Sequence, residues 1–122
     1  MATAMRTSAP VIPAKRVNGS EVYSQNGEHL GEIDDVMIEK RSGEVVYAIM
    51  SFGGFLGIGE KFHPLPWKVL NYDKAKDGYV VNLTKDQLTK APYYARNELA
   101  DNDLAWRQRV FDYYQTPPYW AV

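Results

Sequence analysis

The chain of 122 residues contains no cysteine. Without a thiol it can form no disulfide, no thiolate metal site and no cysteine nucleophile. It also has no run of the ~18 apolar residues that a membrane-spanning helix needs, and residues 1–16 lack the apolar core of a secretory signal peptide. These absences predict a cytoplasmic protein without a membrane span.

An excess of charge of one sign is missing as well. The chain carries 14 Lys and Arg residues against 15 Asp and Glu residues, for a net charge of −1. Domains that bind nucleic acid usually show a clear basic excess, because their affinity comes from neutralising phosphates. We therefore expect no nucleic-acid partner.

Groups that could carry out catalysis are sparse. The two histidines, His29 and His63, are far apart, whereas a metal site needs three or four convergent ligands. Asp34 and Asp35 could form a carboxylate pair for acid–base chemistry. Adjacent residues of a strand point to opposite faces, however, so a β-bulge is the better interpretation. No Gly-x-Ser-x-Gly motif is present. The sequence predicts a protein that is not an enzyme and has no cofactor and no metal.

A glycine-rich stretch is the most distinctive segment that the chain does contain. Phe55, Leu56 and Ile58 lie between its glycines and are too apolar for a free linker. A phosphate-binding loop would need Gly-Lys-Ser/Thr at the start of a helix, and here a strand and prolines follow instead. We interpret it as a structural loop that ends in a proline–tryptophan corner, with Trp67 buried. Its key residues are Gly53, Gly54, Gly57, Gly59, Pro66 and Trp67.

Short alternating runs, separated by turn signals, predict strands in the first three quarters of the chain. The apolar parity slips at Asp34-Asp35, and a bulge there would restore one buried face. Residues 84–88 resemble an N-capped helical turn, and the period becomes helical from about Asn97 to Gln115. The fold class is mainly β: a small antiparallel barrel of five or six strands with a C-terminal helix. The expected strands are 21–24, 29–39, 45–52, 61–65, 69–72 and 79–83.

The strand over residues 45–52 is apolar on both faces, so something must cover its outer face. The C-terminal helix could do so on its own barrel, a second subunit could do so, or the aromatic end of the chain could bind another molecule. From this surplus of apolar surface we predict a homodimer. The predicted interface consists of Tyr47, Ile49, Leu99, Trp106, Val110, Phe111, Tyr113 and Tyr114.

Residues 31–36, 42–46 and 53–67 together resemble the PRC-barrel family. The resemblance implies a PRC-barrel domain over 17–92, preceded by a poorly ordered arm over 1–16 and followed by a helix and aromatic tail over 93–122. It also implies a non-catalytic module for protein interaction or assembly, most similar to free-standing bacterial members. The family offers two alternatives: an RNA- or ribosome-associated maturation factor of the RimM type, and an accessory protein of electron transfer like the reaction-centre H subunit.

Overall fold

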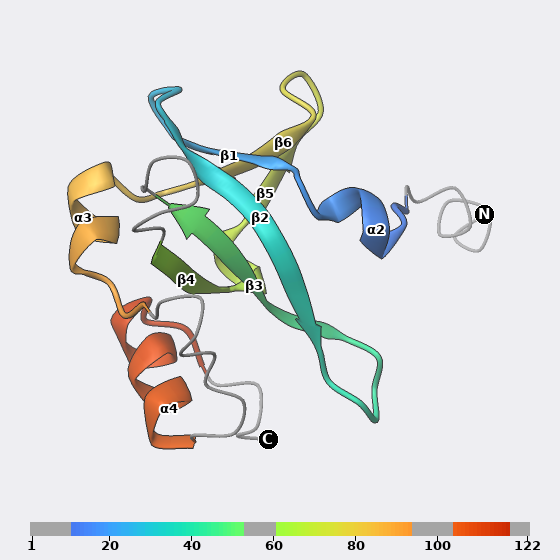
Figure 1. Cartoon of the computed structure of the whole chain (residues 1–122), viewed down its shortest axis with the longest axis vertical. Coiled ribbons are helices and arrows are strands. Elements are labelled where there is room, and N and C mark those ends of the chain that lie inside the picture. The colour runs from blue at the N-terminus through green and yellow to red at the C-terminus, as the bar shows by residue number, and fades with distance from the viewer. Residues whose placement is uncertain (1–10, 53–60, 94–103, 118–122) are drawn as a thin grey trace, which may run out of the picture.

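The computed structural model describes residues 11–52, 61–93 and 104–117, with the backbone alone for 104–106. A six-stranded sheet in the order β4-β3-β2-β1-β6-β5 forms its centre (Figure 1). All neighbouring strands are antiparallel except β1 and β6, which run parallel. The mainly β fold is thus confirmed, with one parallel pair that the expected antiparallel barrel lacks. The strands are β1 (Glu21–Ser24), β2 (His29–Ile38), β3 (Val45–Phe52), β4 (Lys61–Pro66), β5 (Asn71–Asp73) and β6 (Gly78–Val81).

The two edge strands, β4 and β5, follow each other in the chain through the short helix η1 (Trp67–Val69). This short link bends the sheet back on itself, but β4 and β5 do not pair in the described part of the chain. In the ladder with β3, Pro64 lies opposite Ile49 and Pro66 opposite Tyr47. Proline has no backbone N–H and is tolerated in a sheet on an edge strand, which β4 is. Proline on an edge strand discourages other strands from adding to it.

The bulge expected at Asp34-Asp35 is confirmed. In the ladder between β2 and β3, Ile33 pairs with Met50 and Asp35 with Ile49, so Asp34 is the extra residue. Because of this insertion, Ile33 and Val36 both pack on the inner core although they are three positions apart. Gly31 lets β2 lie close to β3, because a Cβ there would lie 2.2 Å from the Ser51 carbonyl oxygen.

The inner core fills the concave side of the sheet and is apolar almost throughout. Ile33, Met50 and Leu65 are fully buried in it. Helix α3 (Lys85–Lys90) adds Leu88, and helix α2 (Ala14–Val17) adds Val17. Residues 14–16 of the predicted N-terminal arm belong to this helical turn. The outer bounds of the three predicted segments stay predictions.

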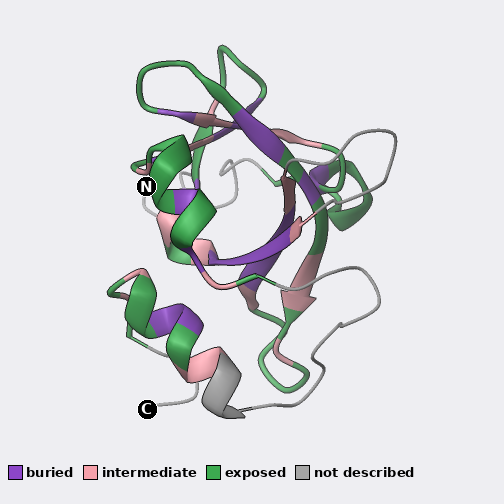
Figure 2. Ribbon diagram, turned by 60° about the vertical axis from the view of Figure 1, so that its left-hand side comes forward, coloured by how far each residue is buried: buried purple, intermediate pink, exposed green. Residues whose placement is uncertain are grey.

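A second apolar cluster lies outside the sheet, under helix α4 (Leu104–Tyr113), which runs beside β4 (Figures 1 and 2). Val110 and Phe111 are almost completely buried there. Their partners on the sheet are Tyr47, Ile49 and Phe62, so both faces of β3 are covered as its sequence requires. The described part of α4 confirms the C-terminal helix. No helix among the described residues is long and apolar enough to cross a membrane.

Candidate interaction surface

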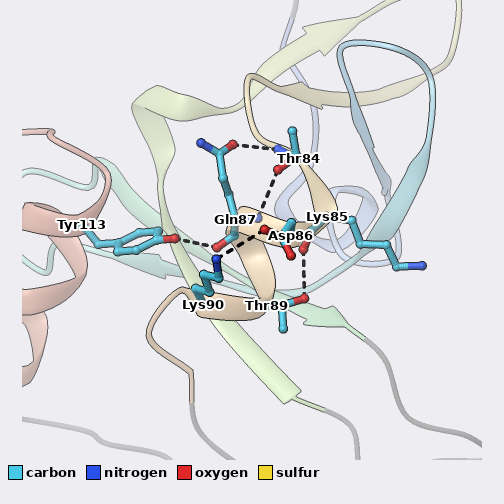
Figure 3. Close-up of polar contacts among 7 residues, drawn as sticks. All are labelled: Thr84, Lys85, Asp86, Gln87, Thr89, Lys90 and Tyr113. Carbon is cyan, nitrogen blue, oxygen red and sulfur yellow. Dashed lines mark hydrogen bonds and ion pairs between the residues drawn. The ribbon is translucent and has the colours of Figure 1, made fainter.

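One tyrosine of α4 forms a hydrogen bond to α3. The Tyr113 hydroxyl donates a hydrogen bond of 2.6 Å to the backbone carbonyl of Gln87 (Figure 3). Gln87 is itself held by a capping box: its backbone N–H donates to Thr84 Oγ1, and its side-chain oxygen accepts from the Thr84 backbone N–H. This confirms the N-capped turn expected at Thr84. The carbonyl that receives Tyr113 is therefore fixed by the local fold of α3.

A cleft of about 630 Å³ opens between the end of α3 and the side of α4. We call it the α3–α4 cleft. Two of its tyrosines are well exposed for aromatic residues, Tyr93 at 45% and Tyr113 at 38%. Its lining residues are Lys90, Ala91, Pro92, Tyr93, Arg109, Asp112 and Tyr113.

Positive charge surrounds these tyrosines. The Lys61 ammonium lies 4.6 Å from the centre of the Tyr93 ring, a distance that allows a cation–π contact. Lys90 forms an exposed ion pair with Asp86 at 3.5 Å, which holds it only weakly. Arg109 is exposed as well. The cleft thus offers aromatic faces next to cations that a ligand could engage.

One buried histidine lies behind Tyr93. His63 is fully buried, and its ring packs against Phe52 and Tyr93 with centroid separations of 5.5 and 5.7 Å. Neither ring nitrogen has a well-formed hydrogen bond in the described structure. Burial, together with the nearby charge of Lys61, lowers the pKa of His63 to about 4, while the Pro92 backbone opposes the shift. His63 is therefore neutral at physiological pH.

The chemical groups singled out in the sequence do not converge. His29 is on the surface beside Glu21, with which it forms an ion pair, and His63 is buried elsewhere. Asp34 and Asp35 are exposed neighbours on the bulge. Among the described residues, no three His, Asp or Glu side chains gather in a way that could hold a metal ion.

The predicted interface residues fall into four groups. Tyr47, Ile49, Val110 and Phe111 do form an apolar contact, but within one chain. The Tyr114 ring is half-buried between the two apolar clusters, and burial raises the pKa of its hydroxyl. Tyr113 is not part of the apolar contact, because its ring borders the cleft. Leu99 and the side chain of Trp106 lie outside what the structure describes.

Only the end of the predicted structural loop lies within the described residues. The four glycines, Gly53, Gly54, Gly57 and Gly59, lie outside the described residues. Pro66 is fully buried, as a corner requires. Trp67, which was predicted to be buried, is half-buried. The centroids of its ring and the Tyr79 ring lie 5.5 Å apart in an edge-on arrangement, and Trp67 packs against the inner core. Trp67 contributes to the core without being its centre.

Sequence reasoning missed three residues of the cleft: Lys90, Tyr93 and Arg109. The signal for Tyr93 was its place after Ala91-Pro92, where a proline ends the helical turn and exposes the next side chain. No pattern could show that Arg109, on the face of α4 away from β3, would meet the end of α3.

Comparisons with known proteins agree with this architecture. The sequence profile of the PRC-barrel domain matches residues 10–88, more than half of the chain. An uncharacterized protein of Deinococcus radiodurans is 28% identical over 113 residues. That alignment covers 81% of this chain and 39% of the relative, so the chain spans well under half of that protein.

Among solved structures, a 16S ribosomal RNA processing protein, RimM, from Pseudomonas aeruginosa is similar with a TM-score of 0.43 and 20% identity. The similarity covers 66% of this chain and 49% of the RimM chain. The chain therefore spans about half the length of that protein as well.

Proposed function

We propose that this chain, which belongs to the PRC-barrel domain family, is a non-catalytic protein-interaction module that docks its partner at the α3–α4 cleft. Family membership supports the fold of the module and leaves its partner open. A cytoplasmic location is part of the proposal, in keeping with the absence of cysteine.

One observation carries the proposal: two exposed aromatic side chains border the same cleft in the described part of the chain. The outer face of β3 is already buried under α4, so it is not available to a partner. Tyr93 and Tyr113 remain accessible beside a concave surface. Tyrosine suits interfaces because it offers a large rigid area with a polar tip.

The charge around the cleft narrows the chemistry of the partner. Lys61, Lys90 and Arg109 lie at or beside the tyrosines, and Asp112 is engaged by a hydrogen bond of 2.9 Å from Gln108. A complementary protein segment would place an apolar or aromatic side chain between the tyrosines and a carboxylate at Arg109. We therefore propose an acidic segment of another protein as the occupant.

A charge-reversal experiment tests this function. Wild-type protein and the double variant Lys90→Glu/Arg109→Glu are used as bait in native lysate. The variant Lys74→Glu/Lys76→Glu, with the same change of charge, alters exposed residues of the β5–β6 turn and serves as the control. We expect a set of proteins captured by wild type and control and lost by the cleft variant. Capture that all three baits share equally would contradict the proposal.

A second function, RNA or ribosome association, is favoured by the way charge is distributed. Residues 21–44 hold seven acidic and two basic side chains, whereas residues 61–122 hold nine basic and seven acidic ones. The near-neutral total thus combines an acidic segment with a slightly basic second half, and exposed tyrosines beside cations can stack on bases. Filter binding to 16S ribosomal RNA at about 150 mM salt separates the two functions, since submicromolar affinity would favour RNA.

The homodimer stays a prediction. It was predicted because the outer face of β3 needs a cover, and that face lies under α4 of the same chain, so this reason no longer requires a second copy. A second copy would have to use another surface, such as the α3–α4 cleft. Sedimentation equilibrium of wild type and the Lys90→Glu/Arg109→Glu variant would show whether the cleft joins two copies.

A further inference from the structure

The side-chain amides of this protein gather in one place. The described residues include eight Asn and Gln side chains, and six of them line two adjoining cavities. Only Asn18 and Gln108 lie elsewhere. The six come from the β1–β2 turn, β5, the end of β6, α3 and the segment after α4, so five separate segments bring them together. They are Gln25, Asn26, Asn71, Asn82, Gln87 and Gln115.

The two cavities form one path along α3. Their volumes are about 470 and 270 Å³, and Asn82, Leu83 and Gln87 line both of them. We call this path the amide groove. Tyr113 lines the larger cavity and also the α3–α4 cleft, so the groove begins where the cleft ends. The hydrogen bond from the Tyr113 hydroxyl to the Gln87 carbonyl is drawn in Figure 3. It lies at the boundary between the cleft and the groove.

Most of these amides have hydrogen-bonding capacity to spare. The structure shows no side-chain hydrogen bond from Asn71, Asn82 or Gln115 to any described residue, and all three are exposed. Gln87 uses its side-chain oxygen for the capping box, which leaves its NH₂ group for a ligand. The groove therefore offers donors and acceptors at several points along its length.

Gln115 carries an independent sign of use. It follows α4 with a φ of +53°, in the left-handed region that favours glycine. The chain closes the helix there with a hydrogen bond from the Thr116 N–H to the Phe111 carbonyl. Glycine would fit this cap better, so the glutamine side chain is kept at a conformational cost.

The chemistry of the lining points to an extended peptide. A side-chain amide carries an N–H donor and a carbonyl acceptor, the same pair that every peptide unit presents. Only Glu28, in the smaller cavity, and Lys68, in the larger, add charge to the lining. A neutral main chain could lie between them and give its repeating donors and acceptors to the amides.

We propose that the amide groove binds the main chain of an extended, largely uncharged segment of a partner protein. This proposal rests on the proposed function as a protein-interaction module and extends it, because a partner docked in the cleft could continue past Tyr113 into the groove. The groove would form hydrogen bonds with the partner's main chain, and the cleft would bind the partner's side chains.

The test begins with a phage-displayed library of random dodecapeptides, selected on the full-length protein. A selected peptide with acetylated and amidated ends is then measured by fluorescence polarisation. We expect the variant Asn71→Ala/Asn82→Ala to bind it about tenfold more weakly or worse, because two hydrogen bonds are lost. The control, Asn18→Ala, removes an amide outside the groove and should bind like wild type.

Two further measurements separate a binding role from a structural one. Gln115→Gly should weaken peptide binding while leaving the melting temperature unchanged or higher, since glycine suits the left-handed cap. Methylating alternate main-chain nitrogens of the peptide should weaken binding more than shuffling its side chains does.

Several outcomes would overturn the groove assignment. These are a library that yields no binder, a peptide that the groove variant binds as tightly as wild type, and equal losses in the groove and control variants. Binding of maltohexaose or cellohexaose that requires Asn82 would assign the groove to sugars instead. If the groove variant binds peptide like wild type while capture in lysate still depends on Arg109, only the groove proposal is contradicted. If peptide binding depends on the groove but capture does not depend on Arg109, only the cleft proposal is contradicted.

Discussion

The two apolar clusters of this protein are built by different rules. The inner core lies within the curved sheet and combines residues from all the longer strands, with Ile33, Met50 and Leu65 fully buried. The buried residues of the outer cluster, in the described part of the chain, come from β3, β4 and α4, and Met37 of β2 packs against them. The inner core follows from strand alternation, whereas the outer cluster needs a helix that arrives from the far end of the chain. The first defines the barrel, and the second decides whether the barrel exposes an apolar face.

Removing the helix should have the largest effect on this comparison. Deletion of residues 94–122 would uncover Tyr47, Ile49 and Phe62, which are each at most 5% exposed in the structure. Each buried side chain of this size contributes about 1.5–3 kcal/mol, and an exposed apolar face seeks another partner. We expect the truncated protein to self-associate or aggregate in light scattering.

Deletion of residues 118–122 provides the control, because it leaves α4 in place. This shorter deletion should leave the scattering unchanged. A longer deletion that stays at the wild-type mass and melting temperature would mean that α4 is not needed to cover β3.

A single substitution in the inner core should have the next largest effect on stability. Leu65 is 0% exposed and packs within the barrel, so Leu65→Ala should lower the free energy of unfolding by about 2–5 kcal/mol. Urea denaturation followed by circular dichroism would measure the loss. A cost below about 1 kcal/mol would show that the inner core is loosely packed at this strand.

His63 is the polar exception among the inward-facing residues of β4, and pH should reveal it. Its pKa is about 4 in the folded protein and about 6.5, the ordinary value for histidine, when unfolded, so the unfolded state binds the proton more readily. The contribution to stability is fully present above pH 6.5. It is lost as pH falls from 6.5 toward 4, by about 3 kcal/mol in all.

The variant His63→Leu cannot take up a proton and should lose this part of the acid sensitivity. Melting temperatures measured from pH 7.5 to pH 4 would compare the two proteins. Parallel curves would mean that His63 has the same pKa in the folded and unfolded states, and its burial would then need a counter-charge.

The smallest expected effect concerns the link between α3 and α4. Tyr113→Phe removes only the hydroxyl that donates to the Gln87 carbonyl. Because both groups are exposed to water, the loss should be about 0.5–1.5 kcal/mol. Chemical denaturation would detect it, and a matched Tyr72→Phe variant on β5 tests another exposed tyrosine hydroxyl, which bonds Asp77.

The sequence predicted the inner part of this fold better than the outer part, for a physical reason. Alternation and turn residues act over a few positions, so β1 and β3 agree with their expected bounds and the bulge at Asp34 could be located. The parity slip between Ile33 and Val36 was enough to reveal it. The parallel pairing of β1 with β6 depends on contacts between distant segments, and nothing local in either strand indicates it.

The surface sites were the hardest to predict. A helical wheel placed Tyr113 on the apolar face, but α4 turns Val110 and Phe111 toward β3 and leaves Tyr113 beside α3. Likewise, Asn71, Asn82 and Gln115 are ordinary polar residues in their own segments. Only their convergence makes a groove, and convergence is a property of the tertiary fold.

The central claim is that α4 covers the outer face of β3 within a single chain. The rings of Tyr47 and Phe111 meet edge to face with their centroids 6.4 Å apart, close enough for a nuclear Overhauser effect between their protons. The direct measurement is an isotope-filtered experiment on an equal mixture of labelled and unlabelled protein. The Tyr47–Phe111 cross-peak should appear in a uniformly labelled sample and be absent from the filtered spectrum of the mixture. A cross-peak that survives the filter would show that the helix lies on a second chain, contradicting the account.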